Sequence, residues 1–161
     1  MARPKPPAHM ITCPDLYGHD HEFAPESIRF RPAAYGVLCH NHQVLLSQSR
    51  FSEKWDLPGG GIEPWETLAD GLAREFLEET GITVSVQRFL EMQENFIAFF
   101  SHPYHSLRFY YTVKLLAPDV TLAPDAHELL DLRWWPTEAL PAGHMNDYEV
   151  RIIQMACQEP E

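Results

Sequence analysis

The segment PGGGIEPWETLADGLAREFLEETGI, residues 58–82, limits the fold of this chain more than any other. Its run of glycines permits a loop that other segments, or a ligand, can approach closely. Helix-forming residues follow, and they predict an α-helix from about Trp65 to Thr80. Gly81 comes next, where a helix C-cap favours a residue that tolerates positive φ. The fold must therefore place a glycine loop just before this helix.

Three glutamates of the predicted helix share one narrow stripe. Glu75, Glu78 and Glu79 are spaced i, i+3 and i+4, which puts their side chains on the same side of a helix. An apolar arc lies beside them and consists of Leu68, Ala69, Leu72 and Phe76. The carboxylates are therefore expected at the rim of the buried face, where their mutual repulsion costs more than it would in water.

A positive group has to compensate this repulsion. Arg74 is adjacent, but one guanidinium cannot neutralise three carboxylates. Mg²⁺ and Mn²⁺ bind carboxylate and carbonyl oxygens, and the glycine loop could add a carbonyl to such a site. The alternative is a solvated acidic helix face, which is what most runs of charge are.

Alternating apolar and polar residues predict the strands of a sheet. Two strands are expected in AAYGVLC and QVLLSQS, joined by a tight turn at HNH. A short extended stretch is expected at Trp55–Leu57. Further strands are expected in ITVSVQRFLEM, in ENFIAFF and LRFYYTVKLL on either side of a loop SHPYHS, and in LLDLRWW. By the same alternation, most of the aromatic residues Phe96, Phe109 and Tyr111 are expected in the core.

The C-terminal part predicts a short helical turn from Thr137 and then a helix capped by Asp147. The apolar side of that helix is expected to contain Ile152, Ile153 and Met155. Strands mixed with two main helices predict an α/β fold, with a mixed sheet between helices.

The proline-rich residues 1–27 predict an extended N-terminal arm, and residues 28–161 a single domain. His19 and His21 follow Cys13 in CPDLYGHDH, but this spacing is too loose to predict a zinc site. The alternative is a polar surface arm that packs on a partner subunit, so a homodimer is possible.

Composition excludes some partners. The net charge is −11 with only 12 Lys and Arg, which argues against a nucleic-acid polymer and leaves a small anionic ligand as the possible partner. The 3 cysteines, Cys13, Cys39 and Cys157, form no CxxC and predict free thiols in a reducing compartment. The N-terminus lacks the apolar segment of a secretory signal, and no apolar run is long enough for a membrane span. We expect a soluble, cytoplasmic protein without a membrane partner.

In one register, Gly60, Glu66 and the run REFLEETGI at residues 74–82 fill every fixed position of a known pattern, G-x5-E-x7-R-E-U-x-E-E-x-G-U, where U is bulky and apolar. The sequence thus resembles the Nudix box of MutT-like hydrolases. The flanks QVLLSQSRFSEKWDLPGG and ELLDLRWWPTEAL are also similar to that family. Trp65 departs from it, because the family usually has glycine there, and a bulky residue at this point would narrow or cover the site entrance.

The resemblance implies a Nudix-type α/β/α sandwich that hydrolyses a nucleoside diphosphate linked to another group X, with Mg²⁺ or Mn²⁺ as cofactor. The implied metal ligands are the carbonyl of Gly59 and the side chains of Glu75, Glu78 and Glu79. Arg74 would orient the glutamates, Glu66 would pair with it, and Gly60 and Gly81 would be structural. The general base stays open between Glu75, Glu78 and Glu128.

Group X is less well specified by the sequence. Nucleoside triphosphates, oxidised nucleotides, ADP-ribose and nucleotide sugars all remain candidates. Arg50, Trp55, Glu94 and Arg108 are candidate substrate contacts, although Trp55 could instead pack beneath the glycine loop and the charged three could lie on the surface. Two alternatives to hydrolysis are a nucleotide sensor without activity and an isoprenoid-diphosphate isomerase that would use Cys39.

Overall fold

The computed structural model describes residues 2–118 and 120–158. The N-terminal half contains β1 (Ile11–Pro14), β2 (Asp20–Phe23), β3 (Arg29–Val37), β4 (Cys39–His40), β5 (Gln43–Ser49), β6 (Trp55–Asp56), β7 (Gly59–Gly61) and α1 (Leu68–Thr80). The C-terminal half contains β8 (Val84–Phe99), β9 (His102–Leu115), β10 (Leu129–Pro136) and α2 (Asp147–Cys157). Short 3-10 helices occur at Pro25–Ser27 and Ala142–His144. In the described part of the chain, neither α-helix has the length and hydropathy needed to cross a membrane.

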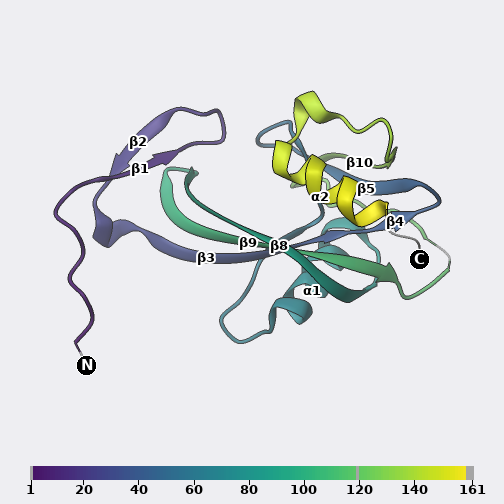
Figure 1. Ribbon diagram of the computed structural model, residues 1–161, viewed down its shortest axis with the longest axis horizontal. Helices are drawn as coiled ribbons and strands as arrows, with labels where there is room; N and C mark the ends of the chain where they lie inside the picture. Colours follow the sequence, from purple (N-terminus) through teal and green to yellow (C-terminus); the bar gives the residue numbers. More distant parts are fainter. Residues whose placement is uncertain (1, 119, 159–161) are drawn as a thin grey trace.

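Two four-stranded sheets form the centre of the molecule. One has the strand order β7-β3-β9-β8, and the other has the order β10-β5-β4 with β6 paired to β5. The pair β3–β9 is parallel and the other pairs are antiparallel, so the predicted mixed sheet is confirmed. Helices α1 and α2 lie on opposite sides of these strands (Figure 1), which confirms the predicted α/β arrangement.

Helix α1 ends at Thr80 as predicted, but it begins three residues later than predicted, at Leu68 instead of Trp65. Thr67 is its N-cap and accepts a hydrogen bond from the backbone N–H of Asp70 at 3.1 Å. Gly81 has φ of 76° and its N–H donates to Leu77 at 2.8 Å, which confirms the predicted C-cap. Leu72 and Phe76 are fully buried as expected, whereas Ala69 is exposed.

The predicted loop SHPYHS is wrong. Strands β8 and β9 are joined by a two-residue turn, Phe100 and Ser101, with φ of 47° and 63°. Two left-handed residues match the twist of an antiparallel hairpin, so most of the predicted loop continues the ladder. The two strands expected before it are a single strand, β8, with bulges between Val86 and Glu91. Phe96 is 38% exposed on this strand and is not a core residue.

Helix α2 packs on the opposite side from α1, through Ile152 and Ile153, which are fully buried as predicted. Its N-cap is Asn146 rather than Asp147, and Met155 is 42% exposed rather than apolar-side core. The chain after β10 forms a turn, so the short helix predicted from Thr137 is displaced to the 3-10 segment Ala142–His144.

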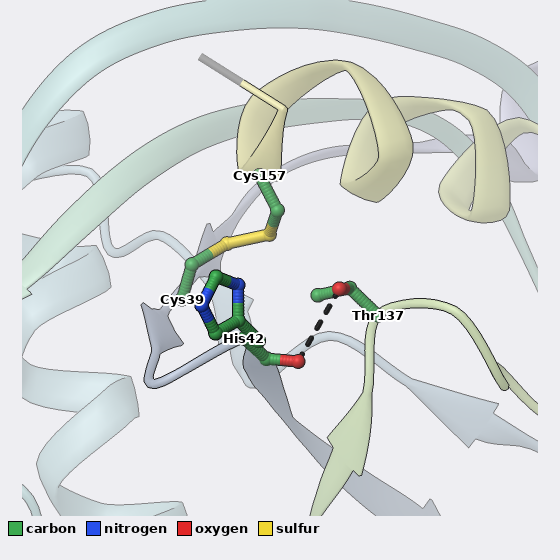
Figure 2. The surroundings of a disulfide bond; sticks show 4 residues. All are labelled: Cys39, His42, Thr137 and Cys157. Carbon is green, nitrogen blue, oxygen red and sulfur yellow. Dashed lines mark hydrogen bonds between the residues drawn. A yellow bond between two sulfur atoms is a disulfide. The ribbon is translucent and has the colours of Figure 1, made fainter. Parts of the chain in front are cut away.

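The prediction that all cysteines are free thiols is wrong. Cys39 and Cys157 form a disulfide, with their Cα atoms 6.0 Å apart and a sequence separation of 118. Figure 2 shows that the bond joins the end of α2 to β4, beside the turn where Thr137 donates to the carbonyl of His42. Only the packing of α2 brings these cysteines together, so their spacing in the sequence gave no signal. Cys13 is a free thiol and is buried.

The N-terminal residues are more ordered than an extended arm. β1 and β2 form a hairpin, whose turn is held by Asp15 accepting from the N–H groups of Tyr17 and His19, both at 2.9 Å. Gly18 supplies the positive φ of 84° that this turn needs. The hairpin lies beside the β8–β9 turn of the same chain (Figure 1), and the Tyr17 hydroxyl donates to the Phe51 carbonyl at 3.2 Å.

Candidate active site

A cavity of about 440 Å³ lies where β7, α1, the β8–β9 sheet and the loop before β10 meet. Its walls include Gly59–Gly61, Glu75, Glu79 and Glu128. We call it the glycine-loop cavity. The loop and helix that are adjacent in sequence therefore also form adjacent walls of one cavity.

Glu79 lies deepest among the carboxylates of α1. Its Oε2 accepts a hydrogen bond from the N–H of Gly59 at 2.9 Å. Burial raises the pKa of Glu79 to about 7, and the nearby carboxylates of Asp56 and Glu128 act in the same direction. The hydrogen bonds from Gly59 and Ser47 lower the pKa but do not offset burial. Negative charge at this point is therefore poorly compensated by the protein alone.

The glycines fit the carboxylates closely. A side chain at Gly59 would collide with the carbonyl of Ala34, and its φ of 148° is accessible almost only to glycine. A Cβ at Gly60 would collide with the carboxylate of Glu75. Glu75 is half-buried there, and burial raises its pKa above the ordinary value. The glycine loop thus brings backbone against both carboxylates.

Arg74 connects the loop to the helix. Its guanidinium contacts both oxygens of Glu66, at 2.5 and 3.0 Å, and donates to the carbonyl of Gly61 at 3.2 Å. It also donates to Glu75 at 2.8 Å and Glu78 at 3.1 Å. Arg74 lowers the pKa of Glu66 to about 2, so this pair stays ionised. These contacts are those expected of a residue that orients the glutamates.

Glu78 differs from the other two members of the stripe. Its side chain is 60% exposed, and it does not line the cavity. Among the described residues, no three His, Cys, Asp or Glu side chains converge closely enough to hold a metal ion as they stand. The donor chemistry nevertheless suits a hard cation, because two partly buried carboxylates lie against the backbone of the glycine loop.

Glu128 faces the cavity from the loop before β10, across from α1. Arg50 fixes this loop, because its N–H donates to the Glu128 carbonyl at 2.8 Å and its guanidinium donates to Ala126 and Leu129 carbonyls at 3.0 and 3.2 Å. Arg50 does not line the glycine-loop cavity and supports the Glu128 loop in this structure, so its contact with a phosphate stays a prediction.

The structure separates the other candidate substrate contacts. Arg108 lines the cavity, with a side chain only 13% exposed. Trp55 does not line it and packs in the core, edge-on to Trp135 at 5.1 Å between ring centres. Glu94 bonds to His105 at 2.7 Å and does not line the cavity, whereas its neighbour Asn95 does, so a substrate contact by Glu94 stays a prediction. Successive residues of a strand point to opposite faces, and Glu94 is on the far one.

Trp65 does not cover the entrance of this cavity. It is 82% exposed and is not one of the lining residues. It lies in the turn before α1. The departure from the family pattern at this position therefore leaves the cavity open.

Sequence reasoning missed the residues that hold Arg108. Arg108 donates to Asp56 and to Glu149, both at 3.1 Å, and its guanidinium lies over the ring of Tyr35 at 4.4 Å. Glu149 is fully buried on α2 and also accepts from the Tyr110 hydroxyl at 3.0 Å. Burial raises the pKa of Glu149 well above its ordinary value. Arg31, another missed residue, lines the cavity beside Gly61.

The α/β fold and the glycine loop facing helix carboxylates define the class of Nudix-fold proteins. A family model described as NUDIX domain matches residues 29–154, and the chain belongs to this family. Among solved structures, a NUDIX hydrolase from Nitrosomonas europaea has a TM-score of 0.65 at 20% identity, covering 94% of this chain and 89% of that one. An ADP-ribose pyrophosphatase from Streptococcus suis has a TM-score of 0.62 at 17% identity, covering 81% and 94%. At these identities the likeness shows the fold.

Curated relatives match over a shorter stretch. Diphosphoinositol polyphosphate phosphohydrolase 2 from Rattus norvegicus is 42% identical over 52 residues, which are 32% of this chain and 29% of that protein. A putative 8-oxo-dGTP diphosphatase from Bacillus subtilis is 40% identical over 50 residues, 31% and 34% of the two chains. The matched region is thus about a third of the length of these relatives.

Proposed function

We propose that this protein is a divalent-metal-dependent pyrophosphohydrolase that cleaves a nucleoside diphosphate linked to a group X. The single observation that carries the proposal is the glycine-loop cavity, in which Glu75 and Glu79 face glycine backbone with too little positive charge to balance them. A divalent cation that also binds phosphate oxygens would balance the negative charge of these carboxylates.

The residues that would hold Mg²⁺ or Mn²⁺ are Glu75, Glu79 and the carbonyl of Gly59. Glu78 would join them by turning inward from its exposed position, since only one of its oxygens is bonded to Arg74. A bound Mg²⁺ would neutralise phosphoryl oxygens and lower the pKa of a coordinated water. Arg74 keeps the carboxylates in place during this reaction through its contacts with Glu66 and Gly61.

Glu128 is the general base in this proposal. It faces α1 across the cavity, and its loop is fixed by three hydrogen bonds from Arg50. The oxygen of a water molecule attacks phosphorus, the water proton passes to Glu128, and the bond from phosphorus to the bridging oxygen breaks. Arg31 and Arg108 supply positive charge on the walls for the phosphate oxygens.

A nucleotide is favoured over an inositol polyphosphate as substrate. A molecule with many phosphates needs many cations, and this chain has a net charge of −11. The glycine-loop cavity has two arginines in its walls, Arg31 and Arg108, beside four carboxylates, Asp56, Glu75, Glu79 and Glu128. The charge suits one diphosphate with metal better than a polyphosphate ring.

The test is a substrate panel with Mg²⁺: dGTP, 8-oxo-dGTP, ADP-ribose, a UDP-sugar and a diphosphoinositol polyphosphate. Released nucleoside monophosphate, pyrophosphate and phosphate are measured, with EDTA and Glu79→Gln as negative controls. Glu138→Gln, an exposed glutamate outside the cavity, is the matched control and should keep full activity. Nucleotide turnover that needs metal and Glu79 is the expected result.

Nucleotide binding without turnover of any substrate would contradict the proposal and favour the nucleotide sensor. The isomerase alternative is not supported, because Cys39 is bonded to Cys157 and does not line the cavity.

A further inference from the structure

A second cavity, of about 650 Å³, lies between the β1–β2 hairpin and the β8–β9 turn. We call it the hairpin cavity. Tyr17 and His21 come to it from the hairpin. Three residues, Leu16, Phe51 and Phe100, line both this cavity and the glycine-loop cavity, so the two adjoin.

We propose that the hairpin cavity binds a planar aromatic ring of the substrate, a nucleobase, between Tyr17 and Phe100, while the diphosphate occupies the glycine-loop cavity. This inference rests on the proposed function and extends it to one specific subsite. The N-terminal hairpin is then part of the substrate-binding site rather than an appended arm.

The aromatic rings of Tyr17 and Phe100 are accessible to a ligand. Tyr17 is 73% exposed and Phe100 is 60% exposed, although both line a cavity. An aromatic face left open in a cavity can stack on the face of a base, and every nucleobase has such a face.

Phe100 also occupies a backbone conformation that it does not favour. Its φ of 47° and that of Ser101, 63°, belong to a turn where Asn and Gly are the usual residues. For a bulky residue this left-handed conformation is an outlier, and such strain is typical of positions that serve a function. Here the turn holds the Phe100 ring at the boundary of the two cavities.

Phe51 fixes the geometry of both rings. Its own ring is edge-on to Phe100 at 5.0 Å and edge-on to Phe99 at 6.2 Å between centres. Its carbonyl accepts the hydrogen bond from the Tyr17 hydroxyl at 3.2 Å. The hairpin and the β8–β9 turn are therefore coupled through one residue, which keeps Tyr17 and Phe100 on the same cavity.

The aromatic ring of the glycine-loop cavity nearest to Arg108 is not a comparable platform. Tyr35 has the guanidinium of Arg108 over its ring at 4.4 Å and is stacked on Tyr110 at 5.6 Å. Both contacts occupy ring faces that a base would need.

The charge of the hairpin cavity favours a neutral ring over another phosphate. Two carboxylates, Asp15 and Glu22, line it. The one arginine of its lining, Arg50, already donates to two backbone carbonyls. An anionic group X would meet repulsion here, whereas a nucleobase offers only dipoles and a stacking face.

The experiment compares AMP with ribose 5-phosphate, which has the same phosphate but no base, by calorimetry in the presence of Mg²⁺. The wild type is expected to bind AMP about tenfold or more tightly than ribose 5-phosphate, since stacking of one base supplies an effect of this size. Phe100→Asn, which keeps a residue suited to the turn, and Tyr17→Leu should each reduce the ratio to less than about threefold.

Phe96→Ala is the matched control, because Phe96 is likewise an exposed aromatic residue, but it lies on β8 and lines neither cavity. It should leave the ratio unchanged. An unchanged ratio in both Phe100→Asn and Tyr17→Leu would overturn the inference, as would a wild type that does not distinguish the two ligands.

The measurement does not depend on turnover, so its failure is distinct from that of the proposed function. Hydrolysis that needs Glu79, together with an unaltered binding ratio, would refute only the subsite. If the protein hydrolyses no substrate but Phe100→Asn and Tyr17→Leu still lower the preference for AMP over ribose 5-phosphate, only the proposed activity is refuted.

Discussion

The two helices each direct a glutamate toward the same region, but at different depths and with different consequences. On α1, Glu75 and Glu79 line the glycine-loop cavity itself. On α2, Glu149 is fully buried and bonds to Arg108, which lines the cavity. The same residue type thus lines the cavity on one helix and contacts another cavity-lining side chain on the other.

The helices are also held by different forces. Arg74 anchors α1 to the glycine loop through charged hydrogen bonds to Glu66 and Gly61. Helix α2 is held by apolar contacts of Ile152 and Ile153 and by the disulfide at Cys157. We therefore expect changes on α1 to affect catalysis most and changes on α2 to affect stability most.

The sharpest comparison exchanges carboxylate for amide on each helix. Glu79→Gln should lower kcat by about 10²-fold or more, because it removes a proposed metal ligand. Glu149→Gln should change kcat/KM less than about threefold, because Glu149 is buried with a raised pKa and Gln keeps an oxygen acceptor for Arg108 and Tyr110. Steady-state kinetics on the best substrate measure both. Equal losses in the two variants would contradict the division of roles.

Removal of the disulfide tests how α2 is held. Cys157→Ser should lower the free energy of unfolding by about 2–4 kcal/mol, because the bond closes a long loop of the chain. Chemical denaturation with and without a reducing agent measures the effect, and reduction should destabilise the wild type but not the variant. Cys13→Ser, at a cysteine without a disulfide, shows the cost of losing a buried thiol alone.

Glu149→Leu removes the hydrogen-bond acceptors of the side chain but keeps a side chain of similar volume. It should cost about 1–3 kcal/mol of stability, because Arg108 and Tyr110 each lose a buried hydrogen-bond acceptor. KM should rise several-fold as Arg108 loses its fixed position, while kcat changes less. If Glu149→Gln has the same effect as Glu149→Leu, the charge of Glu149 is what matters and the positioning role is wrong.

The raised pKa of Glu79 predicts a pH dependence of the metal-free protein. Between pH 4.5 and about 7, folded Glu79 keeps a proton that the unfolded chain has lost, so stability falls as pH rises. The decline should exceed that of Glu79→Gln by about 1–3 kcal/mol in EDTA. Thermal or urea unfolding across this range measures it, and added Mg²⁺ should oppose the decline. If the stability of the wild type falls with pH no more than that of Glu79→Gln, Glu79 is not desolvated.

Trp65→Ala should have the smallest effect. The side chain is 82% exposed and lies outside the cavity, so stability should change by less than about 0.5 kcal/mol and kcat/KM by less than about twofold. A large rise in KM would mean that Trp65 contacts the substrate after all, and would extend the site beyond α1.

Local patterns predicted most of the α1 region. The i, i+3, i+4 spacing, the C-cap at Gly81 and the glycines before the helix are interactions between near neighbours in the chain, and all are present in the structure. The same spacing did not predict that Glu78 is exposed, because a stripe of helical residues is wide enough for one edge to face solvent. The positions of most strands along the chain were also predictable, whereas the β8–β9 turn depended on two residues with unfavoured φ.

The sequence by itself determined the α/β class, the family pattern and the stripe of glutamates beside the glycine loop, since these depend on periodicity and spacing over a few residues. Only the tertiary structure decided the Cys39–Cys157 bond, the contact of Glu149 with Arg108 and the contact of Tyr17 with Phe51. These pairs are 118, 41 and 34 residues apart, respectively. Their meeting depends on how sheets, helices and hairpin pack together, and no local pattern of side chains encodes those distances.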